Sequence, residues 1–146
     1  MAKIYSYTKY IDPLITRTLV FPDDGGIELA TIDGITYVSI PDAATLPSIQ
    51  PDEIKASIAL VTITPALTAA IKAASPHTKL ISARIIEKIR EQYTVDHELY
   101  LARIGVGQQQ GLYTPTASEL QEIKDFGVFV EGIRTWGNAE RAKLGL

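Results

Sequence analysis

Residues 114–146 read TPTASELQEIKDFGVFVEGIRTWGNAERAKLGL, and this stretch predicts one long helix. Thr116 and Glu119 have the spacing of a capping box, in which each side chain accepts a hydrogen bond from the other residue's backbone amide. Acidic residues lie near the beginning and basic residues near the end, the order that the helix dipole favours. Apolar or small residues recur every three or four positions, which places them on one face: Leu120, Ile123, Phe126, Val130, Ile133 and Gly137.

Phe129 and Trp136 widen this apolar face. Gly127, Gly132 and Gly137 each cost a helix about 1 kcal/mol relative to Ala, so packing rather than propensity must hold the helix. One interpretation is that the face packs on its own chain. The other is that its aromatic end anchors a protein interface, where Trp, Phe and Arg are enriched. The candidate interface residues are then Phe126, Phe129, Arg134, Trp136 and Arg141.

Composition and charge limit the class of protein. The chain has 146 residues, 46% of them hydrophobic, which is ordinary for a globular protein and too apolar for a disordered one. The net charge of −3 gives no support to binding of a nucleic-acid backbone. There are no cysteines, so disulfides and thiol catalysis are excluded. No signal peptide and no run of 18 apolar residues are found. We therefore expect a soluble protein made in a cytoplasm, with no nucleic-acid partner and no membrane insertion.

The first part of the chain predicts β structure. In Ile4–Tyr10 the residues alternate along the chain, so that neighbouring side chains would lie on opposite faces of a strand. Ile15–Phe21 is rich in β-branched residues. Pro22–Gly26 is a strong turn signal. Asp33-Gly34 is the signature of a type I′ hairpin joining Ile27–Ile32 to Ile35–Ile40. The sequence thus predicts a small antiparallel β part.

Residues 41–51 contain three prolines and mark a boundary between a β part and a helical part. The predicted fold class is α+β, with about four helices after the sheet. The predicted division is a β part at 1–45, a proline-rich linker and connecting segment at 46–63, and a helical part at 64–146. Within the connecting segment, Leu60–Ile63 is β-prone and is expected to return a short strand to the sheet.

Three helices are expected before the last one. Thr64, Ser75 and Thr94 are the predicted N-caps, and Pro follows the first two at the first helical position. Apolar residues at helical spacing mark the inward face of the second helix as Ile81, Ile85, Ile89 and Tyr93. On the third helix the expected inward residues are Val95, Leu99 and Ala102. Gly105–Gly111 is expected to end that helix as a polar loop.

No pattern of catalytic, cofactor-binding or metal-binding residues is found. His77 and His97 are the only histidines, and no HExxH spacing is present. The GxG at Gly105–Gly107 follows a predicted helix rather than a strand, so it does not indicate dinucleotide binding. We therefore predict no catalytic residues, no cofactor and no metal, and a protein that is not an enzyme.

Three segments of the carboxyl-terminal half carry a family resemblance: Ala74-Ser75-Pro76-His77 with Leu80-Ile81; Ile85–Tyr93; and Glu131–Gly137 with the closing KLGL. Through them, residues 50–146 resemble small proteins encoded beside the tail-fibre genes of tailed bacteriophages. The resemblance implies a structural virion component of the tail, in the baseplate, the tail tip or the tail-fibre attachment. Its implied partners are other tail proteins and a second copy of itself.

Two alternatives stay open. A tail-fibre assembly chaperone would share the partner but leave the finished particle. A small carbohydrate-binding module of the host surface would use stacking surfaces from the tyrosine-rich start. On the structural hypothesis, Tyr5, Tyr7 and Tyr10 are further candidate interface residues, because an exposed edge of the strand Ile4–Tyr10 would allow a partner to add a strand.

Overall fold

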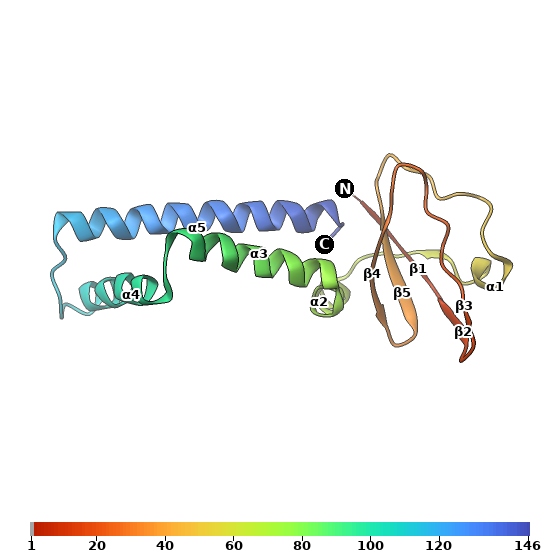
Figure 1. Ribbon diagram of the computed structural model, residues 1–146, viewed down its shortest axis with the longest axis horizontal. Coiled ribbons are helices and arrows are strands. Elements are labelled where there is room, and N and C mark those ends of the chain that lie inside the picture. Colours follow the sequence, from red (N-terminus) through yellow and green to blue (C-terminus); the bar gives the residue numbers. More distant parts are fainter. Residues whose placement is uncertain (1) are drawn as a thin grey trace. The chain divides into compact units, whose positions relative to one another are not determined.

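The computed structural model describes residues 2–146 and confirms the predicted α+β class. Four strands form one antiparallel sheet in the order β4-β5-β1-β6, and two short strands form a separate ribbon, β2-β3 (Figure 1). The strands are β1 Lys3–Tyr7, β2 Tyr10–Asp12, β3 Ile15–Thr16, β4 Ile27–Ile32, β5 Ile35–Ile40 and β6 Ala59–Leu60.

The Asp33-Gly34 hairpin forms as predicted. Asp33 and Gly34 have φ angles of 50° and 80°, so both central residues of the turn are left-handed, as a type I′ turn requires. The turn at Pro22–Gly26 also forms, since the Gly25 amide donates to the Pro22 carbonyl at 3.0 Å. These two turns bracket β4, which pairs with β5 through the Asp33-Gly34 hairpin and shifts register between Glu28 and Ala30.

β1 is an inner strand, which corrects the prediction of an exposed edge at Ile4–Tyr10. β5 pairs with one side of β1, and β6 pairs with Tyr5 and Ser6 on the other. The backbone of Val61 continues this pairing by donating to the Ile4 carbonyl. The edge is occupied because the chain does return a strand after the proline-rich segment, as the β-prone residues before Thr64 predict.

The predicted strand at Ile15–Phe21 is mostly irregular, and only Ile15–Thr16 is extended in a ladder. A side chain replaces the missing strand partner. The amide of Gln50 accepts from the Val20 amide at 2.8 Å and donates to the Val20 carbonyl at 3.0 Å. Gln50 is itself buried, so this pairing satisfies backbone groups that a ladder would otherwise bond.

Five helices follow or interrupt the sheet: α1 Asp52–Lys55, α2 Pro65–Ala74, α3 Pro76–Gln92, α4 Val95–Gln109 and α5 Ala117–Lys143. The Thr64 and Thr94 caps form as predicted, each hydroxyl accepting from an amide three residues later. The capping box of α5 also forms. The Glu119 amide donates to the Thr116 hydroxyl at 3.2 Å, and the Thr116 amide donates to the Glu119 carboxylate at 2.7 Å.

The predicted Ser75 cap and the predicted loop at Gly105–Gly111 are wrong. The Ser75 hydroxyl is buried and has no hydrogen-bond partner among residues 2–146, although α3 does begin at Pro76. α4 continues through Gly105 and Gly107 to Gln109. It is stopped by Gly111, whose φ of 68° ends the helix, while the amides of the next two residues bond back to the Gly107 carbonyl.

The chain divides into two compact units, residues 1–81 with 139–146 and residues 82–138. This differs from the division predicted at the proline-rich segment. In the first unit, Ile71 of α2 packs in one core with Ile4, Leu29 and Leu144. The first helices and the last residues therefore belong with the sheet, and the boundaries fall inside α3 and α5.

Candidate interaction surface

The second unit contains a cluster of aromatic rings around Tyr93, which follows α3. Its ring lies 4.9 Å from Phe126, edge to face, and 5.4 Å from each of Phe129 and His97. Tyr93 is buried, whereas Phe126 and Phe129 are half-buried. Two of the predicted interface residues on α5 are thus engaged mainly with their own chain, which is the first of the two interpretations of that face.

Trp136 is also half-buried, and its ring contacts the side chain of a lysine. The ammonium of Lys88, on α3, lies 5.2 Å from the centre of the indole ring, within the range of a cation–π contact. Arg134 is exposed and takes part in none of the ion pairs found among residues 2–146. Arg141 is half-buried and belongs to the first unit, where its carbonyl accepts from the Leu144 and Leu146 amides. The five predicted anchor residues therefore have different surroundings, and Arg141 belongs to a different unit from the other four.

The predicted tyrosines of the sheet have three different environments. Tyr10 is 55% exposed, Tyr5 is half-buried against a core cluster, and Tyr7 is only 1% exposed. Tyr7 is a core residue, so it presents no surface to a partner and no ring face to a sugar. Of the three, Tyr10 alone is open to solvent.

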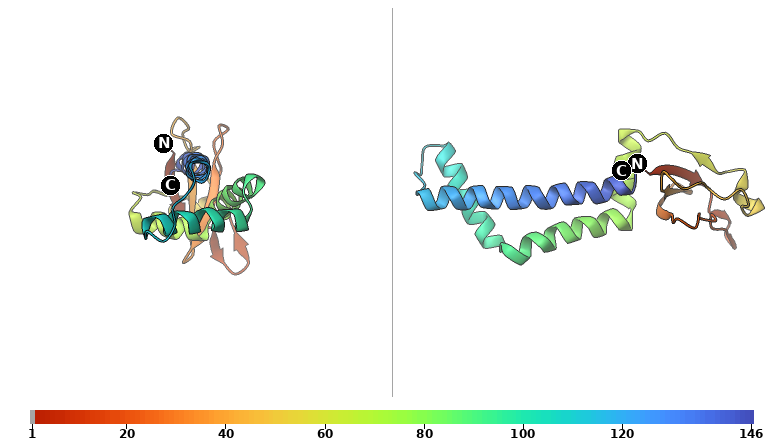
Figure 2. Two further views of the ribbon diagram at one scale, coloured as in Figure 1. Left: turned by 90° about the vertical axis from the view of Figure 1, so that its left-hand side faces the viewer. Right: turned by 90° about the horizontal axis from the view of Figure 1, so that it is seen from above.

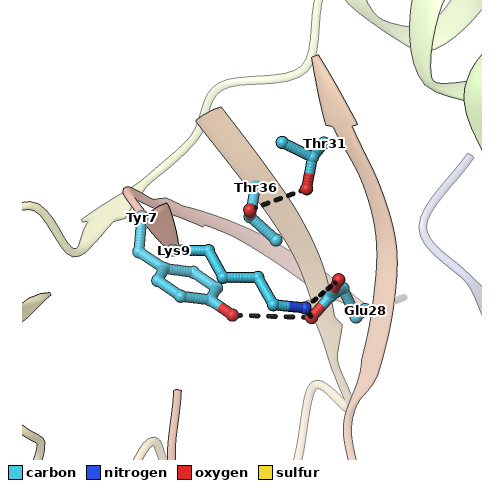
Figure 3. Close-up of polar contacts among 5 residues, drawn as sticks. All are labelled: Tyr7, Lys9, Glu28, Thr31 and Thr36. Carbon is cyan, nitrogen blue, oxygen red and sulfur yellow. Dashed lines mark hydrogen bonds and ion pairs between the residues drawn. The ribbon is translucent and has the colours of Figure 1, made fainter. Parts of the chain in front are cut away.

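Tyr7 belongs to a polar cluster that joins the sheet to the segment after β1 (Figure 3). The Lys9 ammonium donates to both carboxylate oxygens of Glu28 at 2.8 Å, and the Tyr7 hydroxyl donates to one of them at 3.5 Å. Next to it, the hydroxyls of Thr31 and Thr36 are 2.8 Å apart.

The charges of this cluster are held in their ordinary states. Burial raises the pKa of the Tyr7 phenol above 10.0, and the negative Glu28 raises it further. The hydrogen bond that the Lys9 ammonium donates to Glu28 raises the pKa of Lys9 above 10.5. A phenol that keeps its proton and an ammonium paired with a carboxylate are poor nucleophiles and bases. The arrangement ties strands together and offers no evident chemistry.

A second polar group forms where α4 ends and α5 begins. The Glu119 carboxylate accepts from the hydroxyls of Tyr100 and Tyr113, at 3.0 and 2.9 Å, besides its bonds to Thr116. The Thr116 amide, and then the Tyr113 hydroxyl, lower the pKa of Glu119 below 4.5. The hydrogen bond to Glu119 raises the pKa of both tyrosines. Glu119 thus fastens the connecting loop to both helices.

His97 is the histidine nearest to a carboxylate, with its Nε2 atom 3.0 Å from Glu122. No group of three His, Cys, Asp or Glu side chains placed to hold a metal ion occurs in the part of the chain from residue 2 onward.

The largest departure from the predicted packing is on α4. Val95 and Leu99, which were expected to face inward, are 52% and 58% exposed, and Ala102 is exposed as well. The buried residues are instead Leu101 and Ile104. Both sets have helical spacing, so the sequence offers two apolar faces, and periodicity alone cannot tell which is inward.

The exposed set continues to Val106, which is 52% exposed. We call Val95, Leu99, Ala102 and Val106 the outer stripe of α4. A groove of about 300 Å³ borders it on one side, where Ile123 and Phe126 of α5 form the opposite wall. A second groove of about 510 Å³ borders Val106 from the other side and is lined by Arg103, Leu112 and Tyr113 among others. In the view from above, α4 crosses α5 obliquely (Figure 2).

Comparisons with known proteins add no relative: no protein-family model, curated protein or solved structure matches the chain. Among residues 2–146, no helix combines the length and the apolar character that spanning a membrane requires.

Proposed function

We propose that this chain is a non-enzymatic structural component of a bacteriophage tail, acting by contact with other proteins. The tail is the assembly that the resemblance of residues 50–146 implies. The candidate positions are the baseplate, the tail tip and the tail-fibre attachment.

The observation that carries the proposal is the incomplete covering of the second unit. Within residues 82–138, the buried large apolar side chains are Tyr93, Leu101 and Ile104. Nine large apolar side chains of the same unit are exposed, four of them along α4. Single exposed apolar residues are ordinary, but a row of them on one helix is typical of a surface that another protein covers.

The polar clusters also support a structural role. Lys9 and Glu28 neutralise each other, and Glu119 is occupied by a helix cap and two tyrosines. Each cluster joins two segments of chain. Glu119 does border the groove of about 510 Å³ beside Val106, but its carboxylate already accepts hydrogen bonds from the Thr116 amide and from two tyrosine hydroxyls. A catalytic acid or base usually has its carboxylate free to reach a substrate.

The test is mass spectrometry of purified particles of the phage that encodes the chain, compared with the lysate of infected cells. The proposal predicts peptides of this chain in the particle at a fixed ratio to a known tail protein. Peptides present in the lysate but missing from the particle would contradict it and support the assembly chaperone instead. Particles assembled normally without the gene would contradict both roles.

A further inference from the structure

We propose that the outer stripe of α4 is a self-association surface, on which α4 of a second copy of this chain packs in the antiparallel direction. This inference rests on the proposed function and names one of its partners. It concerns a face of the second unit that the predicted interface on α5 does not include.

The first argument is the symmetry of the stripe. Val95, Leu99, Ala102 and Val106 follow one another at intervals of four, three and four residues. This spacing reads the same in both directions. When two such helices run antiparallel about a twofold axis, Val95 faces Val106 of the partner subunit and Leu99 faces Ala102 of the partner subunit. At the centre of the contact a large residue, Leu99, therefore meets a small one, Ala102, which favours close helix packing.

The second argument is charge. Asp96 and Arg103 are both exposed, and neither takes part in a hydrogen bond or ion pair found among residues 2–146. They are seven residues apart, about two helical turns, so they lie on the same flank of the stripe. In an antiparallel pair, equal flanks meet. Asp96 then lies beside Arg103 of the partner subunit, and the twofold axis repeats the ion pair.

The opposite flank of the stripe adds no repulsive charge pair to the antiparallel dimer. Its charged residue is Glu98, whose carboxylate is already paired with Arg90 of the same chain. The same flank carries Gly105 and borders the groove against Ile123 and Phe126, so it offers additional apolar surface next to the stripe. A second α4 would cover the stripe and part of this groove together.

The size of the surface sets the expected strength. A helix of 15 residues is about 22 Å long, and its contact is smaller than the roughly 800 Å² per partner of a stable interface. We therefore expect a weak dimer, with a dissociation constant of about 100 µM. Such contacts become effective when an assembly holds several copies close together.

The experiment is sedimentation equilibrium of the full chain and of three variants, Asp96→Arg, Arg103→Asp and the double exchange. Each single variant places like charges together twice per dimer, so its dissociation constant is expected to rise about tenfold. The double exchange restores opposite charges and is expected to return to within about twofold of the wild type. Because both side chains are exposed and unpaired, all four proteins should fold, and circular dichroism checks that they do.

A wild-type chain that remains monomeric up to about 1 mM would overturn the inference. So would single variants that dimerise as well as the wild type, or a double exchange as weak as the singles. These outcomes concern the self-contact alone. A dimer with the expected charge pattern that is absent from purified particles would leave the inference standing and defeat the proposed function.

Discussion

At the scale of single residues, the sequence predicts correctly where α3 begins but wrongly that the Ser75 side chain caps it. Ser before Pro at the start of a helix predicts an N-cap, and α3 does begin at Pro76. The Thr78 hydroxyl donates to the carbonyls of Lys72 and Ser75, so it joins the end of α2 to the start of α3 and does not cap the amides of α3. Ser75 is fully buried, and its hydroxyl has no hydrogen-bond partner among residues 2–146. The sequence predicts where the helix begins, but packing decides where the Ser75 hydroxyl points.

We expect Ser75→Ala to stabilise the protein by about 1 kcal/mol. Burying a hydroxyl that has no hydrogen-bond partner destabilises the folded state, and the substitution removes that hydroxyl. The matched variant is Thr78→Val, which leaves two carbonyls without their hydroxyl partner and is expected to destabilise by about 1–2 kcal/mol. Urea unfolding of both measures the difference. If Ser75→Ala lost stability as Thr78→Val does, Ser75 would be the cap after all.

Tyr7 is predicted from the sequence as an interface residue, but in the structure it is buried. A strand edge would have made it an interface residue, but β6 makes β1 an inner strand. The Tyr7 side chain itself packs in a core with Val38 and Ile54. Its hydroxyl nevertheless keeps a polar partner in Glu28. The same burial that removes it from the surface raises the pKa of its phenol.

A raised pKa in the folded state means that stability is fully present below the ordinary value of 10.0 and is lost as the pH rises through the folded value. We therefore expect the free energy of unfolding to fall as the pH rises from about 9 to about 11. Tyr7→Phe removes this contribution, so its stability should fall less over the same range. The pKa of Lys9 is also raised and acts in the same direction, so a remaining slope in the variant is expected.

Denaturant unfolding at several pH values gives both slopes, and Tyr10→Phe is the control, since Tyr10 is exposed. Parallel curves for wild type and Tyr7→Phe would contradict the assignment of the alkaline slope to Tyr7.

At the scale of elements, the sequence predicts well wherever the signal is local. The Asp33-Gly34 hairpin, the caps of α2 and α4, and the capping box of α5 depend on a few neighbouring residues, and all form. Prediction fails where a distant segment decides. The segment Ile15–Phe21 has strand-like residues, yet the buried Gln50 binds the Val20 backbone and only two residues remain in a ladder.

Glycines give a paired prediction for two of these elements. Gly34→Ala should destabilise by about 1 kcal/mol or more, because the φ of 80° in the hairpin is strained for any other residue. Gly127→Ala should instead stabilise by about 1 kcal/mol, because Gly127 lies inside α5 and an added Cβ has no neighbour within 4 Å among residues 2–146.

Thermal unfolding of the two variants measures both signs. A loss of stability in Gly127→Ala would mean that the Gly127 surface is covered when the protein is folded in solution, and would contradict the open surface described here.

α4 is the element on which sequence and structure differ with most consequence. Val95, Leu99 and Ala102 form a regular apolar face, and the expectation that it points inward follows from that periodicity. The helix also carries Leu101 and Ile104 on its opposite side, and these are the buried residues. The exposed apolar face is the observation from which we infer that a second copy of the chain covers α4.

At the scale of the whole molecule, the fold class follows from the sequence, but the division into units does not. The proline-rich segment is a reasonable boundary by composition. Contacts between Ile71, Leu144 and the sheet residue Leu29 nevertheless place α2 and the last residues in the first unit. These contacts join residues far apart in the chain, and no local pattern encodes them.

The surface predicted from the sequence and the exposed apolar surface of the structure lie on different helices. Sequence predicts a protein–protein interaction through a helix, and it names the aromatic end of α5. In the structure, Phe126 and Phe129 pack around Tyr93, and Trp136 lies under Lys88. The uncovered apolar surface lies on α4. Aromatic residues are typical of interfaces and of cores alike, and in this small unit the rings form part of its own core.

The central claim, that the outer stripe of α4 meets another copy of the chain, is tested most directly by thiol cross-linking. The chain has no cysteine, so a single introduced thiol reports on its position alone. Ala102→Cys places the thiol in the centre of the stripe. The control is Val128→Cys, on α5, where the native side chain is 69% exposed. Both variants are treated with a short bis-maleimide, and dimers are counted on a denaturing gel.

We predict covalent dimers for Ala102→Cys and almost none for Val128→Cys at the same concentration. Adding Arg103→Asp to Ala102→Cys should reduce the yield severalfold, in keeping with the weakened contact. Equal yields at the two positions would mean random collision, and no dimer at Ala102→Cys would mean that the stripe does not meet its counterpart. Either result would contradict the account.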